Sequence, residues 1–236
     1  MAMEDTRAAC SVVQIDSTEV IQQGLGLFEM YYNSGRGRLW YENGECIRAE
    51  EGREFTASEQ VLIVYSLLVE FVDAMEALGR GNFADVRQEL SSWDMTRPAA
   101  SLLKIAALMD SINQQLGCTG VHINNKLSEV EIGFTPEAIA ALSHFTRDVY
   151  KDKLETRLQG LKSLFINTDY KVFAGLEYCK VTLFDKADTV TKILHGIDGG
   201  VVIGLGDSAV DVSFLALEPA GVDYRGYYVG DPLFVS

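Results

Sequence analysis

The sequence predicts an α+β fold of helices packed on antiparallel sheets, because strand-like and helical segments occur in separate blocks along its 236 residues. Two observations support this prediction. Hairpin patterns recur in the first, middle and last parts of the chain, and long helical patterns with their own start and stop signals separate them. With 47% hydrophobic and 23% charged residues, the composition is that of an ordinary folded protein. We expect a single unit over residues 1–236, with a possible internal boundary near 117–120.

Residues 10–50 favour β structure, and a turn sequence gives the clearest evidence. Asn43-Gly44 lies between two apolar-rich runs. Both residues tolerate the positive φ angles that a two-residue type I′ turn requires. This loop predicts a hairpin in which Trp40 lies opposite Ile47.

The next block predicts helices. Thr56 and Glu59 have the spacing of a capping box and stand directly before an apolar run. The run is apolar on most sides of the helix, which indicates a central position in the core. A short helix should follow over residues 83–90. A further helix should begin near Pro98 and end at Gly117, since proline favours the first helical turn and glycine the position after the last.

A second hairpin and a second helix follow. Residues 121–134 predict a hairpin that turns at Asn124-Asn125. In its second strand glutamates alternate with apolar residues, which are Val130, Ile132 and Phe134. Thr135-Pro136-Glu137 is a favourable helix start, and the pattern predicts a helix as far as Gly160.

The C-terminal part is predicted to be mainly β, apart from a short helix over residues 187–194. We expect residues 201–229 to form a meander of three consecutive antiparallel strands. The middle strand, residues 210–217, alternates apolar and polar side chains, so that one face can be buried. Asp207 and Ser208 would lie in the exposed turn before this strand.

Charge and cysteine content exclude several classes of protein. The formal net charge is −14, from 34 acidic and 20 basic side chains, which disfavours binding to nucleic acids and to anionic membranes. The N-terminus lacks the pattern of a signal peptide, and the longest apolar stretch, Val61 to Val72, is too short to cross a bilayer. The four cysteines are far apart and form no CxxC pair, as expected of a reduced, cytoplasmic protein.

The stretch DKADTVTKILHGIDGGVVIGLGDSAVDVSF, residues 185–214, resembles the C-terminal part of haloacid dehalogenase-type phosphatases. The resemblance implies that Lys186 steadies a phosphoryl group. It also implies that Asp207 and Asp211, in the GDSAVD loop, hold Mg²⁺. The fold would then be α/β, haloacid dehalogenase-like, with a helix over residues 209–217 where the meander has its middle strand.

Near the N-terminus, VVQIDST, residues 12–18, is similar to the nucleophile loop of the same family. In that alignment Asp16 would be the general acid/base, and the nucleophilic aspartate would fall on Gln14. An amide cannot form an aspartyl-phosphate intermediate and carries no charge for Mg²⁺. The resemblance therefore lacks the residue that starts the reaction.

Because no intact catalytic set is found, we expect a non-enzymatic protein without a cofactor. It would act through protein-protein contacts, as a regulatory or assembly component. The β segments have edges that must be paired or covered, so we expect a homo-oligomer or a protein partner. The alternative is a haloacid dehalogenase-like, magnesium-dependent phosphatase, or its inactive relative, that uses Asp16, Lys186, Asp207 and Asp211.

Overall fold

The computed structural model describes residues 29–32, 36–42, 45–50, 52–94, 96–206 and 211–229. The chain divides into two compact units, one up to Gly52 and one from Arg53 onward. We describe each unit by itself. That residues 1–236 act as a single unit, or divide near 117–120, stays a prediction.

The first unit contains a three-stranded antiparallel sheet. Its strands are β1 (Glu29–Tyr32), β2 (Gly37–Glu42) and β3 (Glu45–Glu50), with β2 in the middle. Trp40 lies opposite Ile47, so the predicted hairpin register is confirmed. The turn residues Asn43 and Gly44, and residues 10–28 of the predicted β block, lie outside the described residues.

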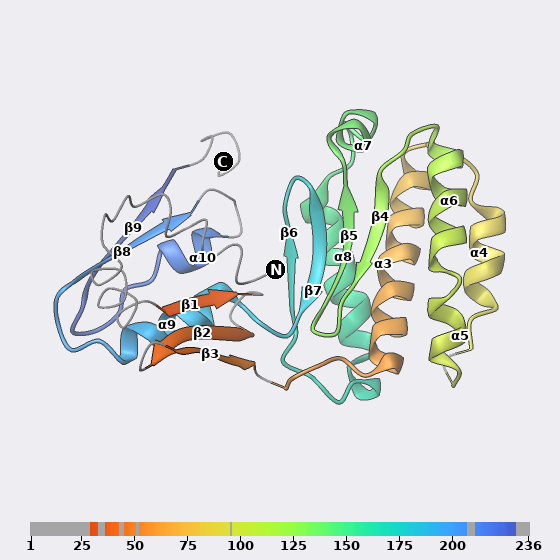
Figure 1. Cartoon of the computed structure of the whole chain (residues 1–236). Helices are drawn as coiled ribbons and strands as arrows, with labels where there is room; N and C mark the ends of the chain where they lie inside the picture. Colours follow the sequence, from red (N-terminus) through yellow and green to blue (C-terminus); the bar gives the residue numbers. More distant parts are fainter. Residues whose placement is uncertain are drawn as a thin grey trace. The chain divides into compact units, whose positions relative to one another are not determined.

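The second unit combines helices with a four-stranded sheet and a pair of parallel strands (Figure 1). Its helices are α3 (Ala57–Ala77), α4 (Ala84–Ser91), α5 (Pro98–Leu102), α6 (Ile105–Leu116), α7 (Pro136–Ala141), α8 (Arg147–Gly160), the 3-10 helix η2 (Lys162–Leu164), α9 (Lys186–His195) and α10 (Val212–Leu215). Its strands are β4 (Val121–Asn125), β5 (Glu129–Phe134), β6 (Lys171–Ala174), β7 (Tyr178–Thr182), β8 (Val201–Gly206) and β9 (Asp223–Tyr228). The predicted α+β class is therefore confirmed.

Helices α3 and α8 cover one face of the four-stranded sheet, whose strand order is β4-β5-β7-β6 (Figure 1). Alternate side chains of its strands are buried, among them Val130, Ile132, Val172, Cys179 and Val181. The intervening side chains are more polar: Glu129 accepts a 3.0 Å hydrogen bond from Lys180. The alternation predicted for residues 129–134 is thus confirmed.

Helix α3 is the centre of this core. Its capping box forms as predicted: the Thr56 hydroxyl accepts a hydrogen bond from the Glu59 N–H, and the Glu59 carboxylate accepts one from the Thr56 N–H. Most side chains of α3 are buried, in agreement with a pattern that is apolar on most sides. Tyr150 of α8 is buried and donates a 2.7 Å hydrogen bond to the Leu67 carbonyl, which joins the two helices.

The helix expected from Thr135 to Gly160 begins and ends as predicted but breaks at residues 142–146. Its start is capped by the Thr135 hydroxyl, which accepts a hydrogen bond from the Ala138 N–H. Within the break Phe145 is buried, and its ring packs against Phe71.

Two other boundaries differ from the expected ones. The helix expected from Pro98 to Gly117 is divided between α5 and α6, although it ends at Gly117 in the left-handed conformation, as the glycine signal predicts. The second hairpin turns at residues 126–128, where the Lys126 N–H donates a hydrogen bond to the Glu129 carbonyl. The predicted turn residues Asn124-Asn125 belong to β4 instead.

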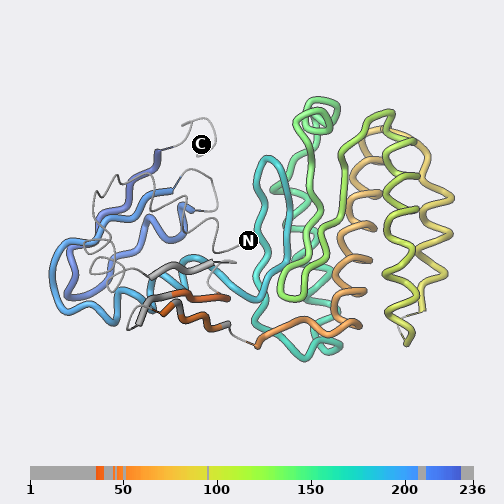
Figure 2. The backbone as a smooth tube through the Cα atoms, in the orientation of Figure 1, coloured from red at the N-terminus to blue at the C-terminus, as the bar shows by residue number. Residues whose placement is uncertain are grey.

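The predicted antiparallel meander over residues 201–229 is wrong. Strands β8 and β9 pair in parallel, with Gly204 opposite Gly226, and the segment between them contains the short helix α10 (Figure 2). Parallel strands need a connection that returns along the sheet, and this segment supplies it. Asp207 and Ser208, expected in an exposed turn, lie outside the described residues.

Packing explains why α10 forms despite the alternating pattern of residues 210–217. A Cβ at Gly226 would overlap the backbone of Leu215 at the end of α10, so glycine permits a close approach of helix and strand. Phe214 of the same helix is buried. Tertiary contacts of this kind outweigh the modest strand preference of valine and phenylalanine. The helix predicted over residues 187–194 is confirmed as α9.

Candidate functional site at the end of β8

The carboxyl end of β8 lies near the amino end of α9. Lys186, in the first turn of α9, reaches Asp211, which directly precedes α10, and the Lys186 Nζ and Asp211 Oδ1 atoms are 2.6 Å apart. Parallel strands of α/β segments commonly bind ligands beyond their carboxyl ends. The two predicted site residues that the structure describes, Lys186 and Asp211, therefore lie together beyond the end of β8.

The two members of this ion pair differ in exposure. The Asp211 side chain is 3% exposed, whereas that of Lys186 is 47% exposed. Gly206 permits the burial of Asp211, because a Cβ at Gly206 would approach the Asp211 Cβ to 2.5 Å. An ammonium group has three donors, and Asp211 holds it from the buried side. The exposed side can donate to an anion.

A second ion-pair cluster lies beside the start of α9. Asp185 caps the helix by accepting a 2.9 Å hydrogen bond from the Ala187 N–H. Lys171 of β6 donates to Asp185 at 2.8 Å and to Asp188 at 2.7 Å. Burial acts to lower the pKa of Lys171, but the hydrogen bonds to the two carboxylates outweigh it and raise this pKa. These contacts fix the start of α9 against β6.

The described residues do not fit a magnesium site. In this part of the chain, no group of three or more His, Cys, Asp or Glu side chains could hold a metal ion. The Asp211 carboxylate binds the Lys186 ammonium, which would compete with a cation for the same oxygen atom. Asp207 and Asp16, the other carboxylates that the resemblance implies, lie outside the described residues. The described residues of this site thus form an ion pair of one carboxylate with one ammonium group.

Sequence reasoning found Lys186 and Asp211 but assigned them separate roles, one toward a phosphoryl group and one toward a metal. Their direct ion pair is a new observation. The sequence patterns do not indicate a role for Lys171, which is separated from Asp185 by the β6–β7 hairpin. No local motif marks Lys171, because only the folded hairpin brings it to α9.

Comparison with protein-family models finds no match, and no curated protein is significantly similar to this chain. Among the helices of the described residues, none combines the length and the apolar character needed to cross a membrane. The molecule is thus an α+β protein with a half-exposed lysine held by a buried aspartate. Its function has to be inferred from this geometry.

Proposed function

We propose that this protein binds a phosphoryl group at Lys186 without hydrolysing it, as an inactive relative of haloacid dehalogenase-type phosphatases. The ion pair between Lys186 and the buried Asp211 carries this proposal. It joins two residues that the resemblance assigns to one site, although they are 25 positions apart in the sequence.

The surroundings of Lys186 support an anionic ligand. The residue lies in the first turn of a ten-residue helix, where the helix dipole favours negative charge. The short helix α10 that follows Asp211 also agrees with part of the helix over residues 209–217 that the resemblance implies.

The absence of hydrolysis is proposed from Gln14. This residue occupies the aligned position of the nucleophilic aspartate, and an amide cannot form the acyl phosphate through which the reaction would pass. Binding and catalysis are therefore separate expectations, and each has its own test.

Thermal unfolding in inorganic phosphate tests binding. A ligand that binds only the folded state stabilises it by RT ln(1 + [L]/Kd), about 2.7 kcal/mol at a hundredfold excess over Kd. We expect Lys186→Met to abolish the upward shift in melting temperature, judged against the melting temperature of this variant without phosphate. Lys162→Met, which removes the same charge from an exposed position in η2, should keep the shift. No shift in the unaltered protein, or equal shifts in both variants, would contradict binding at Lys186.

Release of phosphate from phenyl phosphate in the presence of Mg²⁺ tests catalysis. We expect no release above that of buffer, because the nucleophile is missing. Turnover that Asp207→Asn abolishes would show instead an active, magnesium-dependent phosphatase.

Contact with another protein chain is a second candidate function. Val201, Ile203 and Leu205 alternate along β8 and are 57%, 60% and 63% exposed, so one side of this strand carries three neighbouring apolar side chains. Ile203→Asp should reduce self-association or partner recovery, measured by sedimentation velocity and co-purification. Val149→Asp, which changes an exposed valine of α8, should leave self-association and partner recovery unchanged. An unaltered protein that stays monomeric at all concentrations and recovers no partner would contradict this candidate.

A cytoplasmic location belongs to the same set of proposals. Cys118 and Cys179 are free thiols, as is usual in a reducing compartment. Fractionation of cells that contain the protein would test it.

A further inference from the structure

The two edges of the four-stranded sheet differ in how their backbone groups are satisfied. At the β4 edge the Asn113 side chain forms hydrogen bonds with the outward backbone groups of Val121. Its Nδ2 donates to the Val121 carbonyl at 2.8 Å, and its Oδ1 accepts from the Val121 N–H at 3.0 Å. At the opposite edge, no further strand of the described chain pairs with β6. An amide side chain thus replaces a neighbouring strand at one edge only.

The register identifies the groups of β6 that point outward. The Gly175 N–H donates a 2.8 Å hydrogen bond to the Tyr178 carbonyl, in the register of the β6–β7 ladder. Hydrogen-bonded and non-hydrogen-bonded pairs alternate along an antiparallel ladder. Phe173 therefore directs its backbone groups toward β7, whereas Val172 and Ala174 direct theirs to the open edge.

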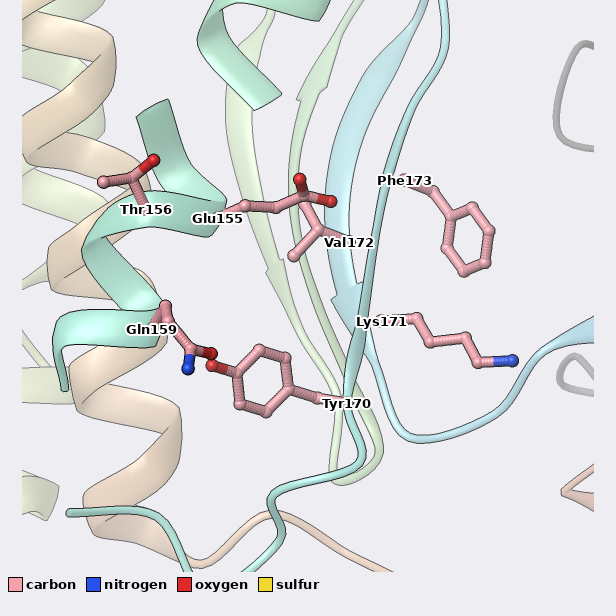
Figure 3. A pocket seen from close by; sticks show the side chains of 7 residues that line it. All are labelled: Glu155, Thr156, Gln159, Tyr170, Lys171, Val172 and Phe173. Carbon is pink, nitrogen blue, oxygen red and sulfur yellow. The ribbon is translucent and has the colours of Figure 1, made fainter. Parts of the chain in front are cut away.

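A cavity of about 720 Å³ lies beside this edge, between α8 and β6. Figure 3 shows Glu155, Thr156 and Gln159 on α8 and the Tyr170 side chain pointing toward Gln159. Val172 points to the same side of the strand and contributes an apolar wall. The cavity therefore combines a carboxylate, an aromatic ring and an aliphatic surface next to unpaired strand groups.

We propose that this edge binds an extended, basic peptide of a partner protein, which adds to the sheet as a strand next to β6. The outward N–H and C=O groups of Val172 and Ala174 pair with the peptide backbone. Every second peptide side chain enters the cavity. There the Glu155 carboxylate, whose Oε1 atom is paired with Lys151 at 3.0 Å, and the Tyr170 ring favour lysine or arginine, whose apolar stem packs against Val172.

Charge distinguishes this partner from a second copy of the chain. At this edge the net charge of −14 favours a cationic peptide over a second, equally acidic copy of the chain. Lys171, the cation on β6 itself, is paired with Asp185 and Asp188. The inference is independent of phosphate binding at Lys186, since the two use different elements.

Fluorescence anisotropy with a short peptide of alternating arginine and valine tests the proposal. We expect this peptide to bind and an alternating glutamate and valine peptide not to bind. Ala174→Pro removes an outward N–H and leaves the ladder with β7 intact, so it should weaken binding about tenfold, or 1.4 kcal/mol. Ala174→Ser keeps the N–H and should bind like the unaltered protein.

Two further readouts separate strand addition from general attraction to an acidic protein. Glu155→Lys should weaken binding more than Asp110→Lys, which makes the same charge change at an exposed position of α6. Amide exchange at Val172 and Ala174 should slow when the arginine peptide is added. The proposal is overturned by no binding, by equal binding of the two Ala174 variants, by equal effects of the two charge changes, or by a dimer formed through β6.

Discussion

At the scale of single residues, the buried Glu59 carboxylate joins two distant parts of the second unit. It is 1% exposed and, besides its contacts with Thr56, accepts 2.7 Å hydrogen bonds from the backbone N–H groups of Ile166 and Asn167. The Asn167 side chain donates a further one at 3.1 Å. A buried charge is tolerated where hydrogen bonds satisfy it, and here they fix the start of α3 to the segment after η2.

Glu59→Gln should lower the free energy of unfolding by about 2–3 kcal/mol, because the new amide group would face donors where the carboxylate accepts from them. Asp110→Asn, at an exposed position of α6, should change it by less than about 0.5 kcal/mol. Urea denaturation measures both values. Equal stability of the two variants would refute the role assigned to Glu59.

Low pH should remove the contribution of the Glu59 carboxylate to the free energy of unfolding. Burial acts to raise the pKa of Glu59, but hydrogen bonds from Asn167 and Thr56 outweigh it, and the pKa lies below its ordinary value. A carboxylate with a lowered pKa in the folded state stabilises the fold above the pKa of the unfolded chain, about 4.3, and loses this effect as pH falls through the folded-state pKa. The stability difference between the unaltered protein and Glu59→Gln should be full near neutral pH and shrink below about pH 4. Denaturation curves across this range that show a constant difference would contradict the expectation.

Local sequence spacing predicts only some of the hydrogen bonds that Glu59 forms. The pairing of Thr56 with Glu59 follows from the capping-box pattern, since both residues lie in one helical turn. Ile166 and Asn167 are more than a hundred positions from Glu59, at separations of 107 and 108. No periodicity or motif identifies a partner at that distance, and the same is true of Lys171 beside α9.

At the scale of elements, the sequence signals predict where helices start and stop better than whether they continue. The caps at Thr56 and Thr135 and the stop at Gly117 are where the pattern predicts them. Within the break before α8, the Phe145 ring contacts Phe71, which belongs to a different helix. Such a contact is a property of the folded core and is not encoded in the local pattern.

The C-terminal segment gives the clearest failure of pattern reasoning. Alternation over residues 210–217 satisfies the rule for a strand, yet α10 forms there because it packs closely on β9. The signal that could have indicated this packing is Gly226 in β9, where an added Cβ would overlap the Leu215 backbone of α10.

Gly226→Ala should therefore destabilise the protein by about 1–3 kcal/mol, because the added Cβ overlaps the Leu215 backbone and α10 must move. Gly160→Ala, at the end of α8 with open space around the new Cβ, should be neutral or slightly stabilising. Urea denaturation of both variants is the measurement. An unchanged midpoint for Gly226→Ala would show that the packing of α10 on β9 is loose.

At the scale of the whole molecule, the blocks of the sequence predict the α+β class correctly, and the alternation of residues 129–134 predicts which side of the central sheet is buried. Of the candidate site, the resemblance names Lys186 and Asp211, and the structure places their side chains in one ion pair, while their roles stay predictions. The ion pair itself, in which the buried Asp211 carboxylate binds the half-exposed Lys186, is seen only in the structure.

The most direct test of the central claim, that Lys186 binds a phosphoryl group, is diffraction from crystals soaked in tungstate, a heavy mimic of phosphate. We expect an anomalous peak within hydrogen-bonding reach of the Lys186 ammonium, on the side opposite Asp211, and no peak there in Lys186→Met crystals. An ordered Lys186–Asp211 pair without a peak, or peaks only at other lysines, would contradict the claim.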